Sequence, residues 1–122
     1  MSYYESIYIL RPDLSNEQVE QVIRRVGEII SHLGATILRS EMWGRRDLAY
    51  LVKKHAKGFY VFNVLEGNGN MVAELENRLK IDEDVIKYMN VKVDTFVNEP
   101  SAMIQEERRD PKSLEEEGEE DL

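Results

Sequence analysis

The order of the expected elements places this 122-residue chain in the α+β class, as four strands and two helices arranged βαββαβ. Two observations predict that order. Apolar residues recur at helical spacing in two segments, and four other segments are rich in the β-branched and aromatic residues that favour strands. One helical segment follows the first strand and the other follows the third. The order is typical of the ferredoxin-like plan, in which a four-stranded antiparallel sheet carries both helices on one face.

The first strand and the first helix are indicated by residues 3–34. Residues 3–11 are mostly β-branched and aromatic, and Pro12 and Asp13 should end the strand. Ser15 is a typical helix N-cap, and Gln18 stands where the partner in a capping box is found. Behind it runs one continuous apolar stripe: Val19, Val22, Ile23, Val26, Ile29, Ile30 and Leu33. Gly34 then marks the C-terminal cap, so the sequence indicates the start, the apolar face and the end of this helix.

The middle of the chain predicts two strands separated by a break. Residues 35–43 form the expected second strand, and the turn-forming residues 44–47 should end it. A short apolar run at 48–52 and a basic connection at 53–58 follow. Residues 59–66, Phe-Tyr-Val-Phe-Asn-Val-Leu-Glu, have the strongest strand character in the chain and form the expected third strand.

The second helix and the last strand complete the predicted fold. After the turn at residues 67–69, Asn70 can cap a helix whose apolar face consists of Val72, Leu75 and Leu79. Residues 85–97 form the last expected strand, and Pro100 ends the folded body. The chain should therefore consist of a folded domain over residues 1–98 and an extended C-terminal segment over residues 99–122.

The expected sheet is apolar on both faces. Helices cover one face, and the other face of such a sheet is normally polar. On the first and third strands, however, the face that the helices do not cover also has apolar residues: Ile7, Ile9, Tyr60 and Phe62. We expect this set to be partly exposed in the free protein and to be buried by a protein partner.

The net charge of −8 is concentrated in the C-terminal segment. Residues 99–122 contain 3 basic and 10 acidic residues, a net charge of −7, so residues 1–98 are nearly neutral at −1. Residues 106–122 should be disordered, because they cannot bury enough apolar surface to offset the entropy of ordering. Just before them, an extended apolar stretch suited to lying along a protein partner contains Phe96, Val97, Met103 and Ile104.

Several classes of protein are excluded by composition. The chain has no cysteine, and no apolar run approaches the ~18 residues that a membrane span needs. The first residues lack the basic and apolar regions of a signal peptide. We therefore expect a cytoplasmic protein that does not enter a membrane.

No group of residues predicts catalysis or metal binding. His32 and His55 are the two histidines, neither is placed beside a nucleophile, and His55 lies among lysines that disfavour a bound cation. The acidic residues 82–84 lack the alternating ligands and glycine of a calcium loop. Residues 67–70 lack the lysine of a phosphate-binding loop. We expect no catalytic residue, metal, cofactor or small-molecule substrate.

A basic stretch with interleaved aromatic residues predicts nucleic-acid binding. Residues 39–57 contain six basic and two acidic residues, a net charge of +4. Cations neutralise phosphates, and aromatic side chains such as Trp43 and Tyr50 can stack on exposed bases. The alternative is an ordinary solvated basic loop.

The segment Gly44-Arg45-Arg46-Asp47-Leu48-Ala49-Tyr50-Leu51-Val52-Lys53 resembles the G-[R/x]-R-x-L-A-Y-P-I-x-K stretch of the bacterial small-subunit ribosomal protein six family. Leu51 and Val52 replace the usual proline and isoleucine of the motif. The opening Tyr4-Glu5, the Pro12-Asp13 pair and residues 85–89 are also similar to the family. The resemblance covers residues 3–98.

This resemblance implies a structural component of the bacterial small ribosomal subunit. Such a protein would bind the central domain of the small-subunit ribosomal RNA together with ribosomal protein eighteen. Carried over by position, the motif assigns RNA contacts to Arg45, Arg46 and Lys53. Charge and location add Lys54, His55, Lys57, Lys87 and Lys92. The alternative is a ferredoxin-like interaction module that pairs with itself through the apolar sheet face and has solvated lysines.

Overall fold

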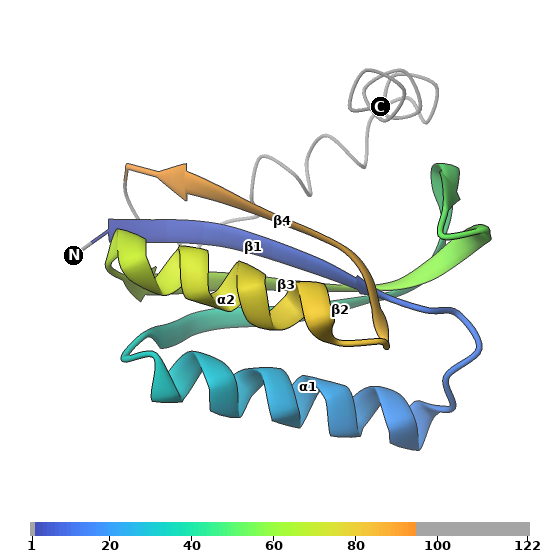
Figure 1. Cartoon of the computed structure of the whole chain (residues 1–122), viewed down its shortest axis with the longest axis horizontal. Coiled ribbons are helices and arrows are strands. Elements are labelled where there is room, and N and C mark those ends of the chain that lie inside the picture. Colours follow the sequence, from blue (N-terminus) through green and yellow to red (C-terminus); the bar gives the residue numbers. More distant parts are fainter. Residues whose placement is uncertain (1, 95–122) are drawn as a thin grey trace.

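A four-stranded antiparallel sheet carries two helices on one face in the computed structural model, which describes residues 2–94 (Figure 1). The strands are β1 (Ser2–Leu10), β2 (Thr36–Val52), β3 (His55–Gly67) and β4 (Val85–Val93), and the helices are α1 (Asn16–His32) and α2 (Gly69–Ile81). The strand order is β2-β3-β1-β4, so β2 and β4 are the edges. The predicted α+β, ferredoxin-like fold is confirmed.

Helix α1 has the boundaries that its sequence predicts. The Ser15 hydroxyl accepts a hydrogen bond from the Gln18 backbone N–H, and the Gln18 side chain accepts one from the Ser15 N–H, which completes the capping box. At the other end, Gly34 has a φ of 80°. Glycine adopts this left-handed conformation without strain, and a residue in it ends a helix.

Helix α2 begins two residues earlier than the sequence predicts. The Oδ1 atom of Asn68, rather than Asn70, accepts the capping hydrogen bond from the Met71 N–H at 2.9 Å. The prediction failed because both asparagines precede the apolar stripe at capping distance. Leu75 and Leu79 are buried as expected, but Met71 is buried in place of Val72, which is only half-buried.

The main core lies between the helices and one face of the sheet. It contains the α1 stripe, the inner face of α2 and the strand residues Tyr8, Leu10, Val61 and Leu65. Burying side chains of this size is worth roughly 1.5–3 kcal/mol each. These strand residues alternate with Ile7, Ile9 and Phe62, which therefore point to the opposite face.

The face opposite the helices is not open at Ile7, Ile9 and Phe62, contrary to the expectation from the sequence. Their exposed fractions are 6%, 5% and 0%, and Tyr60 is half-buried. A second apolar cluster covers them, to which β2 contributes Leu38, Trp43, Leu48 and Val52. The Trp43 ring stacks on Phe62 at 5.4 Å and on Tyr60 at 6.2 Å between centroids. The face assignment was correct, but the chain supplies its own cover.

That cover comes from the long hairpin of β2 and β3, which the sequence divided wrongly. Residues 44–47 do not end a strand, because β2 continues through them to Val52. Gly44 has a φ of 80° at a register shift, which makes it a bulge within the strand rather than a turn. The end of the hairpin curls away from the side of the sheet that carries the helices (Figure 1).

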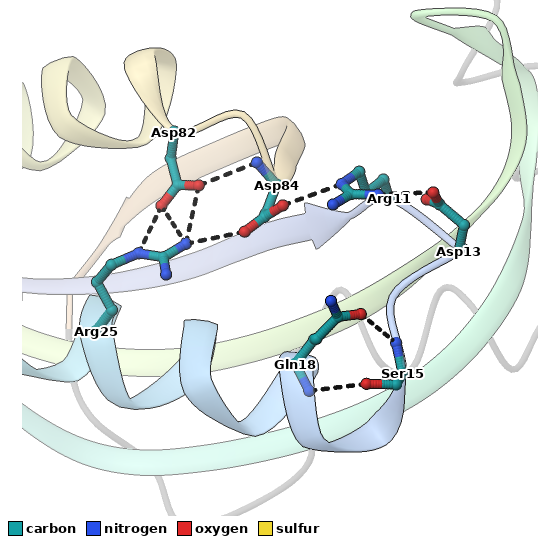
Figure 2. Close-up of polar contacts among 7 residues, drawn as sticks. All are labelled: Arg11, Asp13, Ser15, Gln18, Arg25, Asp82 and Asp84. Carbon is teal, nitrogen blue, oxygen red and sulfur yellow. Dashed lines mark hydrogen bonds and ion pairs between the residues drawn. The ribbon is translucent and has the colours of Figure 1, made fainter.

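An ion-pair network ties both helices to the end of β1 (Figure 2). Arg25 of α1 donates to both carboxylate oxygens of Asp82, at 2.9 to 3.0 Å, and to Asp84 at 3.2 Å. Arg11, which follows β1, donates to Asp84 at 3.0 Å and to Asp13 at 2.6 Å. The acidic turn at residues 82–84 thus pairs with arginines and anchors the fold.

Candidate nucleic-acid interface

The tip of the β2–β3 hairpin is a two-residue turn made of Lys53 and Lys54. Val52 pairs with His55 across it, and the two lysines have φ values of 48° and 70°. A hairpin turn with positive φ at both central residues normally contains Asn and Gly. Residues with a Cβ are strained there by roughly 1–3 kcal/mol each. Both lysines are exposed, so the turn presents two cations in a backbone geometry that other residues would adopt more easily.

Lys57 adds a third exposed cation to the tip. Its Nζ atom lies 3.8 Å from Asp47 Oδ1, and the two side chains are 66% and 84% exposed. A pair this exposed contributes little and leaves the ammonium group accessible. His55, half-buried at the start of β3, lies between Lys54 and Lys57 along the chain.

Arg45 and Arg46 lie on opposite faces of β2, because neighbouring residues of a strand alternate. Arg45 turns toward the helix side, where it donates to the Pro12 carbonyl at 3.3 Å and the Leu14 carbonyl at 2.5 Å. Its guanidinium also lies 5.5 Å from the Phe59 ring centroid. Arg45 therefore anchors the hairpin to the loop between β1 and α1.

Arg46 belongs to the face opposite the helices. Its guanidinium stacks over the Trp43 ring at 5.4 Å, and its Nε donates to the Trp43 carbonyl at 3.2 Å. The stack continues through Trp43 to Phe62. The arginine doublet of the motif is thus divided between the two faces of the hairpin.

The two predicted lysines on β4 have different surroundings. Lys87 meets the hairpin, and its Nζ donates to the Tyr50 hydroxyl at 2.6 Å and lies 4.8 Å from the ring centroid. Lys92 pairs with Tyr4, five residues further along β4 than Lys87 and on the other face of the sheet. The structure therefore gathers Lys53, Lys54, His55, Lys57, Arg46 and Lys87 around the hairpin, and it separates Lys92 from them.

An apolar strip on β4 is the exposed remainder of the face opposite the helices, and the sequence did not single it out. Met89 and Val91 are 40% and 41% exposed, and they stand beside Ile7 and Glu5 of β1. Their alternation along β4 was the available signal. The predicted partner residues Phe96, Val97, Met103 and Ile104 lie outside the described residues.

Two charged groups on this face interact with the sheet. Burial raises the pKa of Glu5, and Arg39 partly offsets that shift. Arg39 pairs with Glu41 on β2 and lies 5.9 Å from the Phe62 ring centroid. Sequence reasoning missed these residues because adjacent opposite charges resemble an ordinary solvated strand edge.

Over residues 2–94, no group of three or more acidic or histidine side chains is arranged to hold a metal ion. Within the same part of the chain, neither helix is long and apolar enough to span a membrane.

A family model described as ribosomal protein S6 matches residues 3–92 of the chain. The chain belongs to the ribosomal protein S6 family. It is accordingly a structural component of the small ribosomal subunit, located on the ribosome in the cytoplasm, and its family is not one of enzymes.

Relatives and solved structures agree with this membership. The chain is 52% identical over 103 residues to the small ribosomal subunit protein bS6 of Magnetococcus marinus, covering 84% of this chain and 72% of the relative. It is 43% identical over 112 residues to bS6 of Hyphomonas neptunium, covering 90% and 100%. The crystal structure of 30S ribosomal protein S6 from Thermotoga maritima is similar with a TM-score of 0.72 and 29% identity, covering 75% of this chain and 87% of that one.

Proposed function

We propose that the tip of the β2–β3 hairpin binds the ribosomal RNA of the small subunit, in its central domain, and that ribosomal protein eighteen binds beside it. The observation that carries the RNA proposal is the turn of two exposed lysines in the left-handed region. Folding alone favours Asn-Gly at such a turn. The strained lysines are explained if their ammonium groups bind RNA phosphates.

The shape of the tip supports this proposal. A two-residue turn is narrow, and Lys53, Lys54 and Lys57 project from it with Asp47 as the neighbouring acid. A narrow cationic ribbon can approach a folded RNA without contact from the rest of the sheet. Phosphate contacts of this kind fix the position of a protein and carry no base specificity.

Replacement of Lys53-Lys54 by Asn-Gly separates the RNA role from the structural one. The variant should be more stable than the wild type, because the strain is relieved, and it should bind RNA more weakly. The slope of log affinity against log salt should fall by about 0.7–0.9 for each phosphate that is no longer neutralised. Lys92→Gln is a control with a single charge change at a distant site. An unchanged salt slope in the Asn-Gly variant would refute the proposal.

The surface proposed to bind ribosomal protein eighteen is the exposed strip of Met89 and Val91 on β4. Ile7, Ile9 and Phe62 are buried by the chain itself, so a partner on this face meets Met89 and Val91 first. The paired variant Met89→Glu with Val91→Glu should weaken binding to ribosomal protein eighteen and leave folding largely intact.

Ile81→Glu is the matched control, since Ile81 is 77% exposed at the end of α2. Equal loss of partner binding in both variants would contradict the assignment. Association of the protein only with itself would favour the alternative of a self-pairing module.

A further inference from the structure

The outer part of the β2–β3 hairpin, residues 47–57, is here called the arm. It leans across the sheet instead of continuing in its plane. In the strand order β2-β3-β1-β4, two strands separate β2 from β4. A flat hairpin would therefore keep Tyr50 and Lys87 apart, yet their polar atoms are 2.6 Å from each other. The contact joins the arm to the far edge of the sheet.

The arm is held over the sheet by apolar and polar contacts. Leu48 and Val52 pack against the cluster that contains Ile9 and Ile86. Beyond them, the Lys87 ammonium donates to the Tyr50 hydroxyl at 2.6 Å and lies 4.8 Å from the centroid of the ring. Apolar packing tolerates small rotations, whereas a hydrogen bond fixes a direction.

We propose that Lys87 and Tyr50 form a latch that holds the arm in its RNA-binding orientation. Lys87 is then a positioning residue, which contributes to RNA binding through Tyr50 and not through a phosphate. The proposal rests on the function proposed for the lysine turn. It changes the role that charge and location suggested for Lys87.

A latch and a phosphate-binding group have different experimental consequences. Removal of a latch lowers the fraction of molecules in the competent orientation, so the apparent Kd rises by the inverse of that fraction. The bound complex keeps the same phosphate contacts, and the salt slope stays constant. Removal of a phosphate-binding cation lowers the affinity and also lowers the slope by about 0.7–0.9.

The test measures RNA affinity at several salt concentrations for Lys87→Met, Lys87→Arg, Tyr50→Phe and the double variant of Lys87→Met with Tyr50→Phe. Lys87→Met should weaken binding about three- to tenfold, the range of one net hydrogen bond, at an unchanged slope. Tyr50→Phe removes the hydroxyl and keeps the ring, so it should show part of this loss. The double variant should be no weaker than Lys87→Met, and Lys87→Arg should restore most of the affinity.

A measurement without RNA accompanies these affinities. Amide hydrogen exchange of residues 48–57 should become faster in Lys87→Met and in Tyr50→Phe, while exchange in α1 stays as in the wild type. Lys92→Met is the control on the same strand and should change neither the exchange nor the affinity by more than about twofold.

Two results would overturn the latch. A lower salt slope in Lys87→Met with wild-type binding by Tyr50→Phe would make Lys87 a phosphate-binding residue. Unchanged exchange in the arm of both single variants would show that apolar packing alone holds it. If the wild type itself failed to bind RNA, the proposed function would fall, and the exchange rates would still decide whether the latch exists.

Discussion

Replacing Phe62 by alanine tests whether the sheet face opposite the helices is a second core. Phe62 has no exposed surface, stacks on Trp43 at 5.4 Å between ring centroids and pairs with Ile7 across the strands. A phenylalanine-to-alanine change in a core costs about 3–5 kcal/mol, to which removal of the aromatic pair adds roughly 0.5–1.5 kcal/mol. We expect a loss of about 5 kcal/mol in the free energy of unfolding.

Urea unfolding followed by tryptophan fluorescence measures this loss directly, because Trp43 is the single tryptophan of the chain and stacks on the substituted ring. The Trp43 emission of the folded variant should shift, since the ring loses its packing partner. Met42→Ala serves as the control one residue away from Trp43, where the side chain is 65% exposed and the cost should stay within about 0.5 kcal/mol. If Phe62→Ala lowered the free energy of unfolding by less than about 1 kcal/mol and left the emission unchanged, the second core would be refuted. Phe62 would then be assigned to a partner-binding surface.

Three further predictions concern Arg45, Glu5 and the C-terminal residues 106–122. Arg45→Ala should cost about 1–2 kcal/mol of stability, because two carbonyls of the β1–α1 loop lose a charged donor, and should leave the RNA salt slope unchanged; thermal unfolding and binding together check this. Since burial raises the pKa of Glu5, its ionised form opposes folding as the pH rises above its ordinary value of 4.5. Glu5→Gln should therefore raise the Tm near pH 7 and give no gain near pH 3, and a gain that persists at the acidic pH would contradict that cause. Residues 106–122 have no apolar stripe that could pack on the domain, so ending the chain after Gln105 should leave the Tm unchanged. The truncation also removes a net charge of −6 that repels phosphate, so RNA affinity should stay equal or rise slightly at low salt. Loss of RNA binding on that truncation would make the acidic segment a recognition element.

The elements that sequence reasoning located best are those whose signals are local. The N-cap at Ser15, the apolar stripe behind it and the left-handed Gly34 all act within one helix, and the structure contains each of them. Such features need no knowledge of what lies elsewhere in the chain.

The hairpin was predicted less well, because its geometry depends on distant contacts. Gly44 followed by three charged residues resembles a turn, but on an edge strand those charges reach solvent without any turn. Once β2 is extended through them, the alternation of a strand places Arg45 and Arg46 on opposite faces. The curl that brings Tyr50 to Lys87 has no counterpart in the local sequence, and so the packing of Leu48 and Val52 over the sheet could not be foreseen.

The left-handed Lys53-Lys54 turn also bears on the order in which the protein folds. A hairpin with a favourable turn can close within microseconds and act as an early nucleus. Here the turn opposes closure, so the long hairpin depends on contacts with β1 and β4 that are far away in sequence. The pairing of β1 with β3 and the packing of α1 should therefore precede it, and the arm should form after the rate-limiting barrier. In kinetic φ-value analysis, which compares a mutation's effect on the folding barrier with its effect on stability, values should be low in the arm and high in α1 and β1. The tip that we propose to bind RNA should then be the last part to form.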